Sequence, residues 1–285
     1  MQIQHFFDNK MAAFSYVVSD HETRQCAIID PVLDYDMYTA KTVTMPSDNI
    51  IDYVKQHDLN VAWILETHPH ADHLTGAQYL KTKLGGKLGI GEHITDVLKY
   101  WIPIFNTAHD TPLDGSQFDH LFKEGETFSI GNIPVTVLYT PGHTPACISY
   151  LMEDAVFVGD TILMPYVGTA RTDFPGGSAK QLFRSIQKLL SLPDNTRMFT
   201  CHDYPQQAQK ANYLTTVSEQ KTKNCMVHDG ISEADYVAAR NAKDKCKTVP
   251  QLLLPAIQIN LRAGQLSKAE DNGVQYIKIP LNKIG

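Results

Sequence analysis

The chain has no pair of cysteines in C-x-x-C spacing, although it contains five cysteines in 285 residues. Their odd number and scattered positions argue against both a disulfide framework and a cysteine-based zinc site. We therefore expect free thiols, and for the two that stand near candidate metal ligands, Cys147 and Cys201, the role of small buried hydrophobic side chains. The other three are Cys26, Cys225 and Cys246.

The chain also lacks an excess of basic residues and any long apolar run. Its formal charge is −6 and its isoelectric point is near 6.0, so it carries no general electrostatic footprint for nucleic acid or for an anionic membrane. The amino terminus has no basic segment followed by a sustained apolar stretch, and no window approaches a membrane-spanning length. These absences predict a soluble cytoplasmic protein that acts on small molecules.

A cluster of histidines follows the apolar run at residues 61–65. Its sequence is Thr67-His68-Pro69-His70-Ala71-Asp72-His73, which holds three imidazoles and a carboxylate. Alternate residues of an extended loop can direct His68, His70 and Asp72 toward one point, and these ligand types suit zinc, iron or manganese. The cluster therefore predicts a metal site at the end of a strand.

Three further candidate ligands each stand shortly after an apolar, β-rich run. They are His143, Asp160 and His202, and the runs cover residues 134–139, 155–158 and 197–201. Open sheets covered by helices place their active sites at the carboxyl ends of strands. Four strands can therefore deliver all seven groups to one crevice, and this coincidence is the strongest functional signal in the chain.

Taken singly, these residues have ordinary alternatives. His143 suits a solvated turn, and Asp160 suits a turn or a helix cap; His202 shares that ambiguity. The other histidines do not follow a strand in this way, and surface exposure or core packing is the expected role of each. They are His5, His21, His57, His93, His109, His120 and His228.

Strand and helix patterns alternate along the chain. We expect strands at 13–18, 26–29, 87–90, 135–139, 155–158 and 197–201, and helices at 50–57, 75–84 and 179–192. The order recurs in both halves, which predicts two similar layers that face each other. With 43% hydrophobic residues, the chain can form a single domain over 1–285, in which 211–285 is an extension of helices and a closing strand near 274–277.

Residues 100–122 interrupt this alternation. The segment contains Pro103, Pro112, Gly115 and several polar residues, so we expect a long irregular connection. Loops of this length are usually functional or disordered. We predict that it forms a mobile lid or a pocket wall.

The succession of H-x-H-x-D-H, a Pro-Gly-His turn, Gly-Asp after a strand and a final histidine resembles the metallo-β-lactamase superfamily over nearly the whole chain. This resemblance implies an α/β (α+β) fold, an αββα sandwich with the metal site at the strand carboxyl ends. Four segments further resemble the persulfide dioxygenase (sulfur dioxygenase) branch, and Ala71 and Arg-Thr-Asp-Phe at 171–174 distinguish it. The segments are 68–76, 140–147, 170–177 and 201–204.

The resemblance implies a non-haem iron enzyme. In this branch the equivalents of His68, His143 and Asp160 bind one Fe(II) per chain, which leaves coordination positions open for a persulfide and dioxygen. The implied reaction oxidises glutathione persulfide with dioxygen and water to sulfite and glutathione, a step of sulfide detoxification. The residues that would orient the ligands and water through hydrogen bonds are His70, Asp72, His73 and His202.

Residues outside this set also have counterparts in the branch. Arg171 and Asp173 resemble a pair near the iron, with a surface ion pair as the plain alternative. Tyr204 resembles a tyrosine that hydrogen-bonds near the iron-bound ligand, with core packing as its alternative. Three basic residues are candidates to meet the carboxylates of a glutathione-like substrate, although helix-surface solvation is the commoner role of such charges. They are Lys221, Lys223 and Arg240.

Three segments depart from the short mitochondrial-type members and indicate a longer bacterial variant, a group that includes hydrolase-like proteins. They are 38–49, 100–122 and 169–170.

Two other functions stay open. In a dinuclear zinc thioester hydrolase of the glyoxalase II type, His68, His70 and His143 would hold one zinc, Asp72, His73 and His202 the other, and Asp160 would bridge them. A non-catalytic persulfide-binding protein is the third option, against which the intact iron-ligand set argues. The sequence leaves the oligomeric state open, with a homodimer as one option.

Overall fold

The computed structural model describes residues 1–204 and 210–283. The strands are β1 (Gln2–Asp8), β2 (Ala13–Ser19), β3 (Gln25–Ile29), β4 (Val32–Asp36), β5 (Lys41–Val43), β6 (Asn60–Leu65), β7 (Leu74–Thr75), β8 (Lys87–Gly91), β9 (His120–Phe122), β10 (Thr127–Ile130), β11 (Ile133–Tyr139), β12 (Ile148–Met152), β13 (Ala155–Phe157), β14 (Arg197–Phe199) and β15 (Leu214–Thr216). The helices are α1 (Met45–Gln56), α2 (Ala77–Leu84), α3 (Ile94–Phe105), α4 (Ala179–Leu190), α5 (Val217–Lys223), α6 (Glu233–Asp244) and α7 (Leu253–Asn260).

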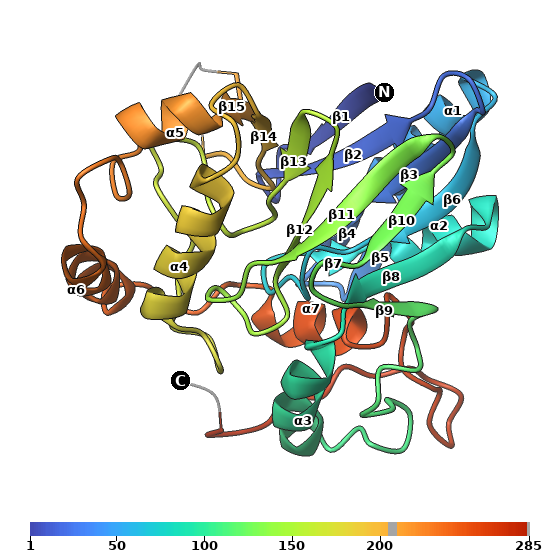
Figure 1. Ribbon diagram of the computed structural model, residues 1–285. Coiled ribbons are helices and arrows are strands. Elements are labelled where there is room, and N and C mark those ends of the chain that lie inside the picture. The colour runs from blue at the N-terminus through green and yellow to red at the C-terminus, as the bar shows by residue number, and fades with distance from the viewer. Residues whose placement is uncertain (205–209, 284–285) are drawn as a thin grey trace.

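Two large sheets face each other in the middle of the molecule (Figure 1). The first has the strand order β1-β2-β3-β6-β8-β9, and the second has the order β10-β11-β12-β13-β14-β15. A small third sheet, β5-β4-β7, adjoins them. The repeated strand order expected from the two halves of the sequence is therefore present as two layers.

The side chains of the first sheet alternate between two cores because successive residues of a strand point to opposite faces. On β2, Tyr16 and Val18 belong to the core between the sheets, where they meet Phe157 and other residues of the second sheet. Val17 points to the opposite face of the sheet, into the core beneath helix α1, which contributes Ile50 to it. Strands buried on both faces need apolar residues at nearly every position, which accounts for the continuous apolar runs in the sequence.

Helices cover the outer face of each sheet. Helices α1, α2 and α3 pack on the first sheet, and α4 packs on the second, beside α5 and α6 (Figure 1). Helix α4 shows why: Leu182, Ile186 and Leu189 form one buried stripe, and the Ser178 hydroxyl caps its amino end by accepting a hydrogen bond from the backbone of Gln181. The αββα sandwich expected from the resemblance is confirmed.

The parallel strands end on the same edge of the sandwich. β3, β6 and β8 are parallel neighbours in the first sheet, and β13 and β14 are parallel neighbours in the second. The segments that leave these strands carry the candidate metal ligands. Gly142, which precedes His143, lies so close to α4 that a Cβ atom would come within 2.3 Å of the backbone nitrogen of Leu182, so only glycine fits there.

The structure corrects two expected segments. Tyr100–Phe105 is the end of helix α3 and His120–Phe122 is a strand, so residues 100–122 are irregular only between these elements. The expected closing strand at 274–277 is not formed; the backbone of Tyr276 bonds to the Ser267 hydroxyl instead of to another strand. In the described part of the chain, no helix is both long and apolar enough to span a membrane.

Candidate metal centre

Three ligand residues from three different loops converge at the edge of the sandwich. We call His68, His143 and Asp160 the outer group. Asp160 Oδ2 lies 3.7 Å from His143 Nε2 and 3.9 Å from His68 Nε2. These separations are too long for hydrogen bonds but suit donor atoms that surround a common cation, and the three ligand atoms lie within 4.8 Å of one another.

The buried Asp30 carboxylate orients the His68 ring through the hydroxyl of Thr67. His68 Nδ1 lies 3.0 Å from Thr67 Oγ1, and that hydroxyl donates to Asp30 Oδ2 at 2.9 Å. Asp30 Oδ1 also accepts from the Thr67 backbone nitrogen at 2.7 Å. Since the hydroxyl proton goes to Asp30, the proton between the ring and Thr67 is on Nδ1, which leaves the Nε2 lone pair for a metal.

His143, which follows β11, is oriented by the loop that follows β13. Its Nδ1 donates to the backbone carbonyl of Arg171 at 2.8 Å, so its Nε2 is also free to ligate. The Arg171 side chain is fixed by two short bonds to the Asp173 carboxylate, at 2.6 and 2.7 Å, and by a third to the carbonyl of Thr248. Phe174 packs edge-on against the His143 ring and beneath the Arg171 guanidinium.

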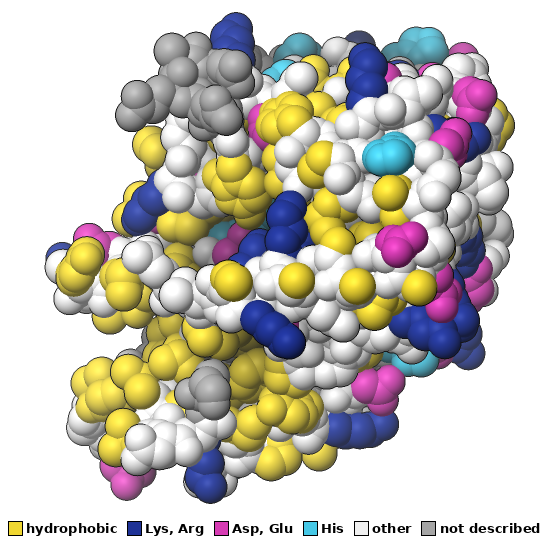
Figure 2. Space-filling view, turned by 90° about the vertical axis from the view of Figure 1, so that its left-hand side faces the viewer, with side chains coloured by type: hydrophobic (Ala, Val, Ile, Leu, Met, Phe, Trp, Pro, Cys, Tyr) yellow, Lys and Arg dark blue, Asp and Glu magenta, His cyan; other side chains and the backbone are white. Residues whose placement is uncertain are grey.

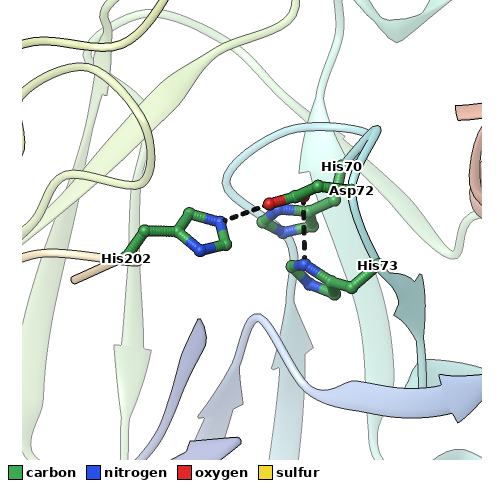
Figure 3. Close-up of side chains that lie close together, drawn as sticks. All are labelled: His70, Asp72, His73 and His202. Atoms are coloured by element: carbon green, nitrogen blue, oxygen red, sulfur yellow. Dashed lines mark ion pairs between the residues drawn. The ribbon is translucent and has the colours of Figure 1, made fainter. Parts of the chain in front are cut away.

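The four remaining ligand residues form an inner group, His70, Asp72, His73 and His202 (Figure 3). The Asp72 carboxylate is its centre: Oδ2 lies 3.2 Å from His202 Nε2, and Oδ1 lies 3.2 Å from His73 Nδ1. His202 Nδ1 donates to the carbonyl of Ala12 at 3.1 Å, which directs Nε2 into the group. All three imidazoles are at most 1% exposed.

Asp160 joins the two groups. Its Oδ2 faces the imidazoles of His68 and His143, and its Oδ1 lies 3.6 Å from His202 Nε2. One carboxylate therefore borders both groups, a position from which it can serve one ion or bridge two.

The donor atoms fit a metal because many form no hydrogen bond. Buried polar atoms normally find hydrogen-bond partners, yet in the described part of the chain several atoms of the site form no hydrogen bond and have at most ion-pair contacts with neighbouring site residues. They are Nδ1 and Nε2 of His70 and of His73, Nε2 of His202 and Oδ1 of Asp160. Neutral imidazoles and carboxylates are suitable ligands for iron or zinc.

The electrostatics of the site favour neutral imidazoles in the outer group. Burial lowers the pKa of His68 well below its usual value, and the imidazoles of His70 and His143 lower it further. Burial also lowers the pKa of His143, against the opposing effect of Asp160. A neutral ring keeps the lone pair that a metal requires, so the lowered pKa values keep both histidines in the form that can bind a metal.

In the inner group, the charges of neighbouring residues outweigh the effect of burial on the pKa values. Burial alone would raise the pKa of Asp72, but His202 and His73 hold it well below its usual value. Burial would lower the pKa of His202, but the carboxylates of Asp72 and Asp160 raise it. Opposite charges thus stabilise the inner group internally.

A buried acid pair holds His70. Its Nε2 lies 3.1 Å from Asp30 Oδ1 and 3.6 Å from Glu66 Oε2. Burial would lower the pKa of His70, but these two carboxylates raise it well above the usual value. Asp30 and Glu66 were not among the predicted site residues, although each directly follows an apolar run, which ends at Ile29 or Leu65.

Asn260, at the end of α7, holds the loop at residues 67–73 in place through hydrogen bonds. Its side-chain amide donates to the carbonyls of His70 at 2.7 Å and His73 at 2.9 Å, and its oxygen accepts from the backbone of Thr75. The sequence separation of 187 to 190 residues left no local signal for this contact.

A cavity of about 370 Å³ opens beside the outer group. His143, Asp160 and Asp72 line it, together with Arg171 and Tyr204. Its other walls come from the loop after β6, the loop after β13, and the end of α6 with the segment that follows it: Ala71, Leu163, Val167, Thr169, Ala170, Phe174, Arg240, Lys243, Lys247 and Pro250.

Tyr204 lies at the rim of this cavity, 54% exposed, with its ring parallel to that of His202 at a centroid distance of 6.1 Å. Core packing, the alternative considered for it, is therefore wrong. Cys147 and Cys201 are buried and unpaired as expected. Burial raises the pKa of the Cys147 thiol to about 12, so it stays protonated.

The three basic residues that the sequence grouped as substrate contacts are not grouped in space. Lys221 pairs with Asp194 and Lys223 with Glu219 on the surface around α5, and neither lines the cavity. Arg240 does line it, but it is 1% exposed and bonds to Asp244 and to the carbonyl of Thr169. The expectation of a Lys221, Lys223 and Arg240 cluster was wrong because helix spacing alone did not show which side faces the cavity.

The chain is similar to several known proteins and matches one family profile. The metallo-β-lactamase superfamily profile matches residues 9–202. A probable metallo-hydrolase of Burkholderia pseudomallei is 45% identical over 100% of both chains, and glyoxylase B2 of Dictyostelium discoideum is 47% identical over 99% of this chain and 97% of its own. The mitochondrial persulfide dioxygenase ETHE1 of Homo sapiens is 28% identical over 92% of this chain and 88% of its own. The crystal structure of ETHE1 from Myxococcus xanthus has 28% sequence identity and a TM-score of 0.74, over 93% of this chain and 100% of that one.

Proposed function

Because this chain belongs to the metallo-β-lactamase superfamily, whose members are metal-dependent enzymes, we propose that it is an iron-dependent persulfide dioxygenase. The substrates are glutathione persulfide, dioxygen and water, and the products are sulfite and glutathione. In this reaction the sulfur–sulfur bond breaks, the terminal sulfur is oxidised and dioxygen is reduced. Water supplies the third oxygen atom of sulfite and the proton of the glutathione thiol.

The observation that supports this proposal is the exposure of the outer group to the cavity. Two members of the outer group, His143 and Asp160, line the cavity wall, as does Asp72 of the inner group, whereas His68 and the inner imidazoles are at most 1% exposed. A molecule that enters the cavity therefore meets the outer group. Two imidazoles and one carboxylate form the facial set that non-haem Fe(II) oxygenases use, with positions left open for substrates.

Other residues of the chain prepare this set. The Asp30–Thr67 contacts and the Arg171 carbonyl hold Nδ1 of His68 and His143 protonated, so both Nε2 atoms keep a free lone pair and would be available to hold the ion. When bound, Fe(II) supplies the redox chemistry that couples dioxygen to the persulfide sulfur. Leu163 and Phe174 give the cavity apolar walls, which limit the access of bulk water to a reactive persulfide.

The comparisons support this branch in part. The ETHE1 of Myxococcus xanthus covers 93% of this chain, and the human ETHE1 covers 92%. The Arg171 carbonyl contacts His143, and the Arg171 side chain pairs with Asp173, which supports the role that the resemblance implies for this pair. The more similar relatives carry the names metallo-hydrolase and glyoxylase, so a second candidate has to be kept.

The second candidate is a dinuclear hydrolase of glutathione thioesters. The position of Asp160 favours it, because its two oxygens face the outer and inner groups separately. All seven ligands of a two-metal site are present, and the inner group contains buried donor atoms that form no hydrogen bond. In this mechanism the bridging carboxylate and the second ion would position a nucleophilic water.

Two assays on one preparation decide between the candidates. Protein purified without oxygen would be given glutathione persulfide in an oxygen electrode, and a glutathione thioester in a separate hydrolysis assay. The proposal expects persulfide-dependent oxygen uptake with sulfite as product and little thioester cleavage. Rapid thioester cleavage without oxygen uptake would reject the dioxygenase and support the hydrolase.

A further inference from the structure

Two lysines at the carboxyl end of α6 border the cavity beside the outer group. Lys243 and Lys247 both line it, together with His143 and Asp160. The chain continues to turn beyond the helix, since the backbone nitrogen of Lys247 bonds to the carbonyl of Asp244 at 2.9 Å. Residues four positions apart on such a turn lie on the same side, so the two ammonium groups face one region.

These lysines differ from the other cations of the cavity in having no acidic partner. Arg171 is paired with Asp173, and Arg240 is paired with Asp244. Within residues 1–204 and 210–283, neither Lys243 nor Lys247 forms an ion pair; the only polar contact of the Lys243 ammonium there is Met226 Sδ, at 3.6 Å. Two uncompensated positive charges therefore remain at the rim of the cavity.

The surroundings make this rim more positive. Burial lowers the pKa of Lys247, and the guanidinium groups of Arg240 and Arg171 lower it further, against weaker opposing effects of Asp244 and Asp173. Four basic side chains thus line one cavity; Arg171 and Arg240 are balanced by Asp173 and Asp244, and the two lysines share the cavity with the carboxylates of Asp72 and Asp160. An anion that enters the cavity would relieve the mutual repulsion of these groups.

Basic side chains are also visible beside a hollow on the molecular surface (Figure 2). Figure 2 shows dark-blue basic side chains beside a hollow in which acidic and histidine side chains are visible. Lys247 also lines an adjoining hollow of about 580 Å³, with Tyr100 and Trp101 of α3 on its far side. A ligand that is anchored on the lysines can therefore reach the metal ligands through one hollow and extend into the other.

We infer that Lys243 and Lys247 bind the carboxylates of a peptide thiol and so direct its sulfur toward the outer group. This inference deepens the proposed function and rests on it for the reaction of the sulfur. The peptide thiol follows from the proposed reaction, because its sulfur is the atom that reacts; both arginine forks of the cavity are occupied, so the two ammonium groups are the cations left to bind its carboxylates. The apolar side chains of Val167, Ala170 and Phe174, which line the same cavity, suit the short carbon segments of such a thiol.

Direct binding of a non-reactive probe tests the inference. S-methylglutathione would be titrated calorimetrically into metal-loaded protein under nitrogen, for the parent and for Lys243→Gln/Lys247→Gln. We expect Kd to rise roughly tenfold in the double variant and the salt dependence of binding to weaken. Lys245→Gln, between the two lysines in sequence but outside the cavity lining, is the matched control and should bind like the parent.

The outcomes separate this inference from the proposed reaction. If the parent binds the probe in a lysine-dependent way but consumes no oxygen, the dioxygenase proposal fails and the binding site stands. If oxygen is consumed but neither Kd for the probe nor KM for glutathione persulfide changes in the double variant, the binding site is wrong. Tighter and more lysine-dependent binding of coenzyme A than of S-methylglutathione would overturn the choice of a carboxylate ligand.

Discussion

The outer and inner groups use the same side-chain types but are held in different ways. In the outer group, His68 and His143 are anchored by oxygen atoms outside the site, the Thr67 hydroxyl and the Arg171 carbonyl. In the inner group, the members contact one another around Asp72, which lies 3.2 Å from both His73 and His202. Ligand type alone therefore does not define a role: the outer imidazoles are oriented by oxygens outside the site, whereas the inner group combines such contacts, at His70 and His202, with ion pairs among its own members.

The largest expected contrast comes from removing one histidine of each group. His143→Ala should abolish persulfide-dependent oxygen uptake, because it removes an iron ligand that lines the cavity. His73→Ala should keep part of the activity, roughly a tenth to a hundredth, because it perturbs only residues that orient the site. Oxygen uptake at saturating substrate, with circular dichroism as the control for folding, measures both. Equal loss in the two variants would remove the distinction between the groups.

The two groups share one support, which offers a sharper test. Asp30 holds Thr67 on the side of the outer group and His70 on the side of the inner group. Asp30→Asn should weaken iron binding roughly 10- to 100-fold, measured by competition with a chelator. Thr67→Ser keeps the hydroxyl that connects Asp30 to His68 and should bind iron like the parent. Unchanged affinity in Asp30→Asn would show that the Asp30–Thr67 contacts do not orient the ligands.

The loop that anchors His143 depends in turn on a buried ion pair. Asp244 bonds to Arg240 at 2.6 Å and to the backbone and hydroxyl of Thr172 at 2.9 and 3.0 Å. Asp244→Asn leaves the buried Arg240 charge unpaired and should destabilise the protein by about 3–5 kcal/mol in urea denaturation. Arg240→Met/Asp244→Asn removes both charges and should cost less. A double variant as unstable as the single one would show that the buried charge is not the cause.

The exposed pair on the same loop should matter least for stability. Arg171 holds the pKa of Asp173 below its usual value, so the pair stabilises the fold at neutral pH and loses this contribution as the pH falls below about 4. Asp173→Asn should cost only about 0.2–1 kcal/mol at pH 7. Urea denaturation at pH 7 and at acidic pH measures the difference between parent and variant. A difference that grows on acidification would contradict this sign.

Local patterns predicted the ligand set because each ligand follows an apolar strand. The runs before His68, Asp160 and His202 correspond to β6, β13 and β14, and the parallel pairing of these strands with their neighbours brings their ends to one edge. Strand order is repeated in both halves, so the two layers could also be expected. These features depend on periodicity within a few residues, which is visible in a single sequence.

Contacts between distant segments could not be predicted in the same way. Asn260 reaches the ligand loop across 187 to 190 residues, and Lys243 and Lys247 reach the cavity because α6 packs beside α4. Because of Pro103, the end of α3 was expected to be irregular. A proline removes only one backbone donor, however, and the buried stripe of Leu98, Trp101 and Phe105 keeps the helix intact. Residues 274–277 have a strand composition but pair with no strand of the described chain, and the side chains of Asn272 and Ser267 bond to the backbone of Val274 and Tyr276 instead.

The metal content of the parent protein tests the central claim most directly. Protein produced with both iron and zinc available, and purified without oxygen, would be analysed for metal per chain by mass spectrometry. A single functional ion on His68, His143 and Asp160 predicts one iron per chain, with activity proportional to iron content. Two zinc ions per chain, with no gain of oxygen uptake when iron is supplied, would contradict the account and identify the inner group as a second metal site.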